Sequence, residues 1–323
     1  MVSDLYLVAP TPEVTMGRMT ARARIIVALA IVYVVWGSTY LALKWVVEGL
    51  PALLSVGLRF VIAGTILFTF LKLRGEKTPT LKQWAGSFPA GVLLFVVGNG
   101  FVSIAEREVS SAVAAVVCGT MPIMLAGFGA FTGERFAKRE IVGLLIGFVG
   151  VAVMTSEALG QASGTAKILL LAPVGWALGS LLTKKLPQPP GLMSAAAQML
   201  GGGLVSTLAA LSLGERLPSG PLDSRSVLAF FYLVFVGSIV AFSAYSYLLR
   251  NARPSLATSY AYVNPGIAIV LGALLGGETI TLSTVIGGGL VVAAVALIVR
   301  GAKQVPAKPA PCLVDSEPVI ATR

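Results

Sequence analysis

Long apolar runs alternate with short polar connections along the whole chain. Because roughly 20 apolar residues cross a bilayer as a helix, the pattern predicts an all-α integral membrane protein with ten transmembrane helices, the fifth and tenth of them short. The ten runs lie at Arg24–Val46, Leu53–Leu73, Trp84–Ala105, Ser110–Thr132, Ile141–Ser156, Thr165–Thr183, Leu192–Gly214, Ser226–Leu249, Leu256–Gly277 and Ile280–Val299.

Two stretches of this pattern resemble each other, Ser111–Gly150 and Pro254–Ala294. Each has small residues, a proline (Pro122 or Pro265), an apolar run, a Gly-Glu pair, and a second glycine-rich apolar run. A shared order of this length predicts an internal duplication. Since five helices per half is an odd number, the second half must enter the membrane from the opposite face. We therefore expect two inverted five-helix repeats around a central cavity, as in many secondary transporters.

Composition and charge agree with a membrane protein and give its orientation. Only 12% of the residues are charged and the mean hydropathy is +0.88, whereas a soluble domain carries about 25% charged residues. Of the 24 Lys and Arg residues, 18 lie on one side of the predicted membrane and 5 on the other, which places both termini in the cytoplasm. The net charge of +10 therefore suits anionic lipids, and nucleic acid is not an expected partner.

The same pattern divides the chain into four parts. These are a cytoplasmic N-terminal segment at 1–23, a first repeat at 24–156, a second, inverted repeat at 157–300, and a disordered cytoplasmic tail at 301–323. The N-terminal segment has no apolar region of its own, so the first apolar run is expected to be a retained span and not a signal peptide.

The first helix carries polar and aromatic residues at mid-span, where lipid would accept Leu or Val. They are Trp36, Ser38, Thr39 and Tyr40, and Trp36 aligns with Trp176 of the sixth helix at an offset of 140. We interpret these side chains as a cavity wall that offers aromatic surface and hydrogen bonds to a solute. The alternative is that the small residues pack helices against one another.

Two further spans contain unusual polar side chains. Arg59 is the only Lys or Arg well inside a span, and it suits a substrate carboxylate; reaching the outer headgroups or pairing with Glu48 is the slightly favoured alternative. Asn99 in the third helix either binds substrate or links helices. Glu106 and Glu108, just past that helix, are expected to be solvated.

The fourth and ninth helices hold the matched prolines Pro122 and Pro265, which are expected to kink them and to expose polar backbone to the central site. Simple shaping of helix packing is the alternative. Nearby Tyr245, Tyr260 and Asn264 suggest a polar and aromatic lining. The matched Gly-Glu carboxylates, Glu134 and Glu278, are expected to close helix hairpins through the following helix N-terminus, with proton coupling as the less favoured role.

The quoted motifs resemble a known family. WGSTY, Arg59-Phe60, Pro122 followed by GERF, and YVNP followed by GGET are similar to EamA-type permeases of the drug/metabolite transporter superfamily, most of all to YedA-like members. The resemblance implies ten helices, a cavity lined by helices one, three, four, six, eight and nine, and export of small metabolites or drugs across the bacterial inner membrane. The first helix lacks the buried Glu of small multidrug exporters, and the cavity helices lack the Lys and Arg cluster that a phosphate substrate would need.

The sequence thus favours a secondary transporter that exports neutral or zwitterionic solutes, with amino acids as the first expectation. The alternatives are an exporter of lipophilic drugs and, more remotely, a membrane-embedded enzyme or a channel. The chain has no histidine and no paired carboxylates inside its spans, so no catalytic residue, cofactor or metal is expected. Expected partners are a small-molecule solute, membrane lipids and, as the candidate coupling ion, a proton.

Overall fold

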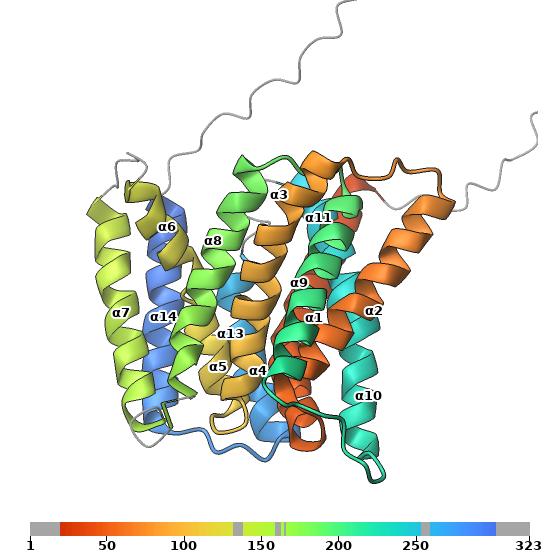
Figure 1. Ribbon diagram of the computed structural model, residues 1–323. Coiled ribbons are helices and arrows are strands. Elements are labelled where there is room, and N and C mark those ends of the chain that lie inside the picture. The colour runs from red at the N-terminus through yellow and green to blue at the C-terminus, as the bar shows by residue number, and fades with distance from the viewer. Residues whose placement is uncertain (1–19, 132–137, 159–162, 165, 253–258, 302–323) are drawn as a thin grey trace, which may run out of the picture.

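The protein is a bundle of antiparallel helices. In this computed structural model, residues 20–131, 138–158, 163–164, 166–252 and 259–301 are described. All ten apolar runs are mainly helical in their described parts, with a break at Gly119 and Thr120 inside the fourth. Figure 1 shows that α1 begins and α14 ends at the same end of the bundle. Most of segment 1–23, the tail from residue 302 and Glu134 lie outside the described residues.

The first half contains the following elements: α1 Ala21–Gly49, α2 Ala52–Leu73, α3 Leu81–Gly91, η1 Val92–Gly100, α4 Phe101–Ala105, α5 Ser111–Cys118, α6 Met121–Phe131 and α7 Lys138–Ala158. Several begin at side-chain caps, as at Thr80, whose hydroxyl accepts from the Gln83 N–H while the Gln83 side chain accepts from the Thr80 N–H. These caps supply acceptors for backbone donors that the first turn of a helix leaves unpaired.

The second half follows the same order of elements. It contains η2 Ala166–Leu171, α8 Ala172–Lys185, α9 Leu192–Ser212, α10 Ser224–Tyr232, η3 Leu233–Val240, α11 Ala241–Asn251, α13 Tyr260–Leu275 and α14 Leu282–Gly301. The elements η1 and η3 are π-helices within long helices, and η2 is a 3₁₀-helix.

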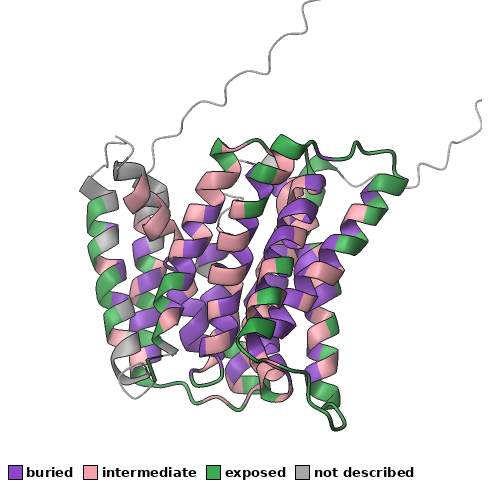
Figure 2. Cartoon of the chain, in the orientation of Figure 1, coloured by how far each residue is buried: buried purple, intermediate pink, exposed green. Residues whose placement is uncertain are grey.

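Length and apolar character qualify six helices in the described residues as membrane spans, and four shorter apolar helices accompany them. Leu145, Phe148 and Leu208 on α7 and α9 are large apolar side chains that remain more than half exposed. Figure 2 shows exposed residues on the outward face of α7, while buried residues gather towards the middle of the bundle. An apolar perimeter of this kind suits lipid.

Helices at equivalent places in the two halves pack against each other. The pairs are α2 with α9 and α7 with α14, and α7 lies beside α14 in Figure 1. The α2–α9 approach depends on small residues, since a Cβ on Gly203 would lie 2.7 Å from the Val61 nitrogen and 3.0 Å from the Gly57 carbonyl oxygen. Close approach of backbones at glycine is a common way for membrane helices to associate.

Carboxylates close one end of the bundle by capping helices across the two halves. Glu278 accepts hydrogen bonds from the Ser111 N–H (2.7 Å), the Ser111 hydroxyl (2.9 Å) and the Ala112 N–H (3.3 Å) at the start of α5. Glu215 accepts from the N–H of Leu54 at the start of α2 (2.7 Å). The sequence-based expectation that the helix following Glu278 would serve it is therefore wrong, because the helix that it caps belongs to the first half.

Candidate functional site

A cavity lies at the centre of the bundle, and the centre of a water-sized sphere can reach about 80 Å³ of it. Its walls come from α1, η1 and α4, the α5–α6 segment, α8, α11 and α13, together with one residue of α2. These are the helices that the family resemblance implied, and Arg59 is the addition from α2. Since each water needs roughly 10–15 Å³ on this measure, the cavity has room for several water molecules or for a small polar solute.

Trp36 and Trp176 come from the first helix of each half and meet at the cavity. Their ring centroids lie 6.4 Å apart at an interplanar angle of 61°. Each ring lies against a glycine in the third helix of the other half: Trp36 Nε1 donates to the Gly237 carbonyl (3.3 Å), and a Cβ on Gly98 would lie 2.6 Å from Trp176 Cδ1. The two halves therefore contribute equivalent contacts to one site, as the offset of 140 suggested.

More rings surround Trp36 and complete an aromatic wall. Phe242, Tyr245 and Tyr260 have centroids 5.3, 5.1 and 4.8 Å from that of Trp36. Edge-to-face pairs of this kind hold rings in fixed orientations. The wall is thus a preformed apolar surface of the kind that binds an aromatic or aliphatic side chain.

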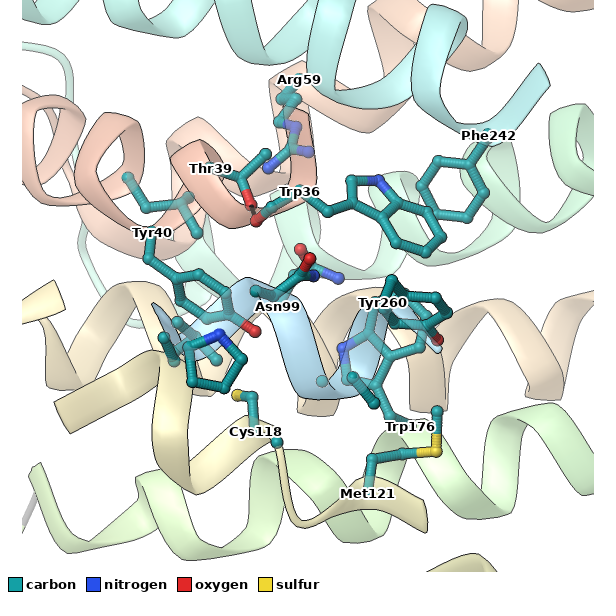
Figure 3. Close-up of a pocket in the computed structure, with 18 residues that line it drawn as sticks. Trp36, Thr39, Tyr40, Arg59, Asn99, Cys118, Met121, Trp176, Phe242 and Tyr260 are labelled. Atoms are coloured by element: carbon teal, nitrogen blue, oxygen red, sulfur yellow. Dashed lines mark hydrogen bonds between the residues drawn. The ribbon is translucent and has the colours of Figure 1, made fainter. Parts of the chain in front are cut away.

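The third helix of each half contains a π-helix, a feature that was not predicted from the sequence, and η1 contributes Gly98 and Asn99 to the cavity wall. In η1 the Asn99 amide donates to the Leu94 carbonyl (3.0 Å), and in η3 the Ser238 hydroxyl donates to the Leu233 carbonyl (2.9 Å). Both bonds reach back five residues, so each polar side chain caps a backbone oxygen of the wider turn. Such segments often mark functional sites, and Figure 3 shows Asn99 in the middle of the cavity.

Arg59 turns inward instead of reaching the outer headgroups. It is 4% exposed, its Nε donates to Ser238 Oγ (3.0 Å), and its guanidinium carbon lies 4.6 Å from the Phe60 ring centroid. Glu48 approaches Arg225 instead (4.0 Å). The favoured interpretation from the sequence, that Arg59 reaches the outer headgroups or pairs with Glu48, is therefore wrong. Packing of α2 against α10 and η3 holds the Arg59 side chain inside the bundle. Among the described residues, its Nη1 has no hydrogen-bond partner.

Whereas Arg59 supplies a buried hydrogen-bond donor, Asn264 supplies a buried acceptor. It is 6% exposed, and its Oδ1 lacks a hydrogen-bond partner within the described part of the chain. The next residue, Pro265, lies inside α13 and has no N–H for the Ala261 carbonyl one turn earlier. Asn264, Pro265 and Ala261 all line the cavity, so this stretch of α13 presents polar backbone and an amide oxygen to it.

The two matched prolines do not act alike. The fourth helix is interrupted at Gly119 and Thr120, and Pro122 follows as the second residue of α6. Its missing N–H there belongs to a first turn that needs no internal partner. The expected kink at Pro122 is thus a break between two helices, whereas Pro265 lies within a continuous one.

The structure brings nine of the twelve residues selected from the sequence to the cavity wall, namely Trp36, Thr39, Tyr40, Arg59, Asn99, Trp176, Tyr260, Asn264 and Pro265. Ser38 lies elsewhere, in a groove between α1, α10 and α13, where it bonds to the Tyr232 hydroxyl (2.6 Å). Tyr245 lies behind Trp36, and Pro122 lies next to Met121 of the wall.

Sequence reasoning missed Phe242, Met121 and Cys118, which also line the cavity (Figure 3). Phe242 is three residues before Tyr245 on one helix face, a spacing that could have revealed it. Cys118 was set aside because no disulfide was plausible, yet its thiol lies against Tyr40. Glu106, expected to be solvated, is fully buried.

A helical bundle with an apolar perimeter and a polar, aromatic cavity at its centre defines a class of membrane transporters. The chain belongs to the EamA-like transporter family, whose pattern matches residues 23–156 and again residues 165–300. The two matches make the halves a duplication, and the family resemblance seen in the sequence is confirmed.

Curated relatives agree with this assignment. The chain is 42% identical over 295 residues to the uncharacterized inner membrane transporter YedA of Escherichia coli (strain K12), covering 90% of this chain and 95% of the relative. It is 24% identical to a probable amino-acid metabolite efflux pump of Salmonella typhimurium, covering 84% and 93% of the two chains. A solved crystal structure that is 20% identical matches with a TM-score of 0.61 over 84% of this chain and 95% of the other, which supports the fold alone. The chain is thus a multi-pass inner-membrane transporter of small molecules and not an enzyme.

Proposed function

We propose that this transporter exports small zwitterionic or neutral solutes, with amino acids first among them. The observation that carries the proposal is a pair of buried atoms, Arg59 Nη1 and Asn264 Oδ1, that have no hydrogen-bond partner among the described residues and whose side chains line one aromatic cavity. Buried polar atoms normally have partners. A solute carboxylate would accept a hydrogen bond from the Arg59 guanidinium, and a solute ammonium would donate one to the Asn264 amide oxygen.

The aromatic wall complements these polar groups. Trp36, Trp176 and Phe242 offer apolar surface for the side chain of an amino acid, and Asn99 adds an amide near the middle. A lipophilic cation would leave Arg59 without a counter-charge, so the cavity favours a carboxylate over a cationic drug. Among the residues of the wall, Arg59 is the single charged one.

We further propose that halves 24–156 and 157–300 are inverted repeats that alternate access to this cavity, with both termini in the cytoplasm. The packing of α2 against α9 and of α7 against α14, which occupy equivalent places in the two halves, supports the pseudo-symmetry. The excess of Lys and Arg on one side supports the orientation. The break at Gly119 and Thr120 offers a bending point in the first half. Export as the net direction draws support from the Salmonella typhimurium relative.

Counterflow in proteoliposomes tests the proposal. Vesicles loaded with unlabelled amino acids should take up a labelled one with no imposed ion gradient, and Trp36→Ala or Asn264→Ala should lower the uptake at least tenfold, since each removes a contact worth about 1.5 kcal/mol or more.

Matched controls separate loss of the site from loss of the fold. Trp84→Ala and Asn251→Ala remove the same residue types outside the cavity, where Trp84 contacts Phe68 and Asn251 donates to Tyr247. Both controls should keep the uptake. Uptake by wild-type protein of lipophilic drugs, and of no amino acid, would contradict the proposed solute class.

A further inference from the structure

Glu106 is a carboxylate buried beside the connection between α4 and α5. It directly follows α4, is 0% exposed, and neither of its carboxylate oxygens has a hydrogen-bond partner among the described residues. Lys44 lies close by, but its ammonium donates to the backbone carbonyls of Glu106 (2.6 Å) and Val109 (3.2 Å) and not to the Glu106 carboxylate. The solute site proposed above does not use this carboxylate.

Glu108, two residues further on, shows how an ordinary carboxylate behaves at this end of the bundle. It is exposed and accepts hydrogen bonds from the Ser163 N–H (2.8 Å) and hydroxyl (2.7 Å), which hold its pKa below the usual value. Burial raises the pKa of Glu106 well above its usual range. Two neighbouring carboxylates therefore differ in the charge state that their surroundings stabilise.

Four ionisable groups face Glu106 from the elements around it. Lys44 of α1 favours the ionised form, whereas Glu278, which follows α13, opposes it. Tyr40 of α1 and Cys118 of α5 also interact electrostatically with the Glu106 carboxyl. Because burial outweighs the opposing effect of Lys44, and because neither carboxylate oxygen has a hydrogen-bond donor among the described residues, the surroundings of Glu106 favour its neutral form.

Glu106 also lies between the central cavity and the contact in which Glu278 caps α5. On one side is the cavity, since Val102, one helical turn earlier, lines it. Tyr40 and Cys118 line it too (Figure 3). On the other side is the contact through which Glu278 caps the start of α5. A change in the α4–α5 connection would therefore alter both the cavity wall and the access of water to Glu106.

We propose that Glu106 is the site at which this transporter binds its coupling proton. The inference rests on the proposed transport function and assigns one residue to its coupling ion. In the arrangement described here, with Glu106 buried, the carboxyl carries the proton; when α4 and α5 separate from α1, water reaches the carboxyl and the proton leaves. Since the arrangement with Glu106 buried binds the proton more tightly, it is favoured at low pH and loses this advantage as the pH rises through the raised pKa of Glu106.

The test compares Glu106→Gln with Glu108→Gln in full-length protein in liposomes. With the membrane potential clamped, an imposed gradient of about one pH unit should let wild-type protein concentrate solute about tenfold if one proton exchanges for each solute. Glu106→Gln should abolish this accumulation and give counterflow that no longer changes with pH. Glu108→Gln should behave like the wild type. Accumulation by Glu106→Gln at the wild-type ratio would overturn the proposal, as would accumulation by wild-type protein that needs sodium and ignores the pH gradient.

A second measurement separates this proposal from the choice of solute. Infrared spectra of wild-type protein and Glu108→Gln at neutral pH should contain the C=O band of a protonated carboxyl that is missing from Glu106→Gln, and Glu106→Asp should shift it. This holds even if no amino acid is transported, in which case only the proposed solute fails. If the wild-type spectrum lacks such a band, Glu106 is ionised and the proton site is refuted whatever the solute.

Discussion

Replacing Arg59 with Gln should have opposite effects on the empty and the occupied protein. In the empty protein the guanidinium is buried, has one unbonded terminal nitrogen, and has no carboxylate within 4.0 Å among the described ion pairs. Its Nε bond to Ser238 is replaceable, because that hydroxyl already donates to the Leu233 carbonyl. Removal of an uncompensated buried charge is neutral or stabilising, so the unfolding temperature of empty Arg59→Gln should equal or exceed that of the wild type.

Binding should weaken in the same variant. A hydrogen bond from a charged donor to a solute carboxylate contributes about 1.5–3 kcal/mol, so its loss should raise the Kd roughly 10- to 150-fold. At a solute concentration of about 100 times the wild-type Kd, bound solute stabilises the wild type by about 2.7 kcal/mol. A 100-fold weaker variant would gain only about 0.4 kcal/mol under the same conditions.

Thermal unfolding in detergent, with and without solute, measures both effects on one sample. Arg225→Gln is the matched control, since Arg225 lies over the Trp45 ring (4.2 Å) with its side chain 48% exposed, and it is not part of the cavity wall. That variant should keep the full stabilisation by solute. If empty Arg59→Gln unfolds at a clearly lower temperature and still gains the wild-type stabilisation, Arg59 is a structural residue and the reasoning fails.

Three more outcomes are expected. Gly98→Ala should cost a net of about 0–2.5 kcal/mol of stability, because crowding Trp176 costs about 1–3 kcal/mol and replacing a helical glycine returns about 0.5–1. A higher unfolding temperature would contradict this expectation. Glu278→Gln should destabilise the protein by about 1–2 kcal/mol and speed hydrogen exchange in the first turn of α5, while unchanged exchange would show that the cap is dispensable. In a Cys312→Ser background, solute should slow maleimide labelling of Cys118 several-fold; labelling at the same rate with and without solute would place the solute elsewhere.

Much of the architecture could be predicted because membrane helices must be long and apolar. The ten runs, the duplication and the paired tryptophans Trp36 and Trp176 all follow from periodicity and alignment within one chain. The π-helices could not be predicted, since Val92–Gly100 has the same apolar composition as an α-helical span. They depend on tertiary contacts such as Trp176 lying against Gly98.

Side-chain direction was the other limit of sequence reasoning. Arg59 near the start of its span is compatible with an outward or an inward direction, and only the packing of α2 against η3 decides between them. Glu106 follows the last residue of α4, where solvent is the ordinary environment of a carboxylate, and its burial arises from segments distant in sequence. Ser38 and Thr39 are adjacent, but one helical residue turns the chain by about 100°, so only Thr39 reaches the cavity.

The single charge in the cavity wall has a consequence for how such a protein could arise by gene duplication. Arg59 aligns with Gln198, which bonds instead to Thr183, Gln188 and Ser194. An assembly of two identical first halves would carry two guanidinium groups at its centre, and one of two identical second halves would carry none. A chain whose two halves differ in sequence can place one cation in the shared cavity and thereby distinguish the two ends of an asymmetric solute.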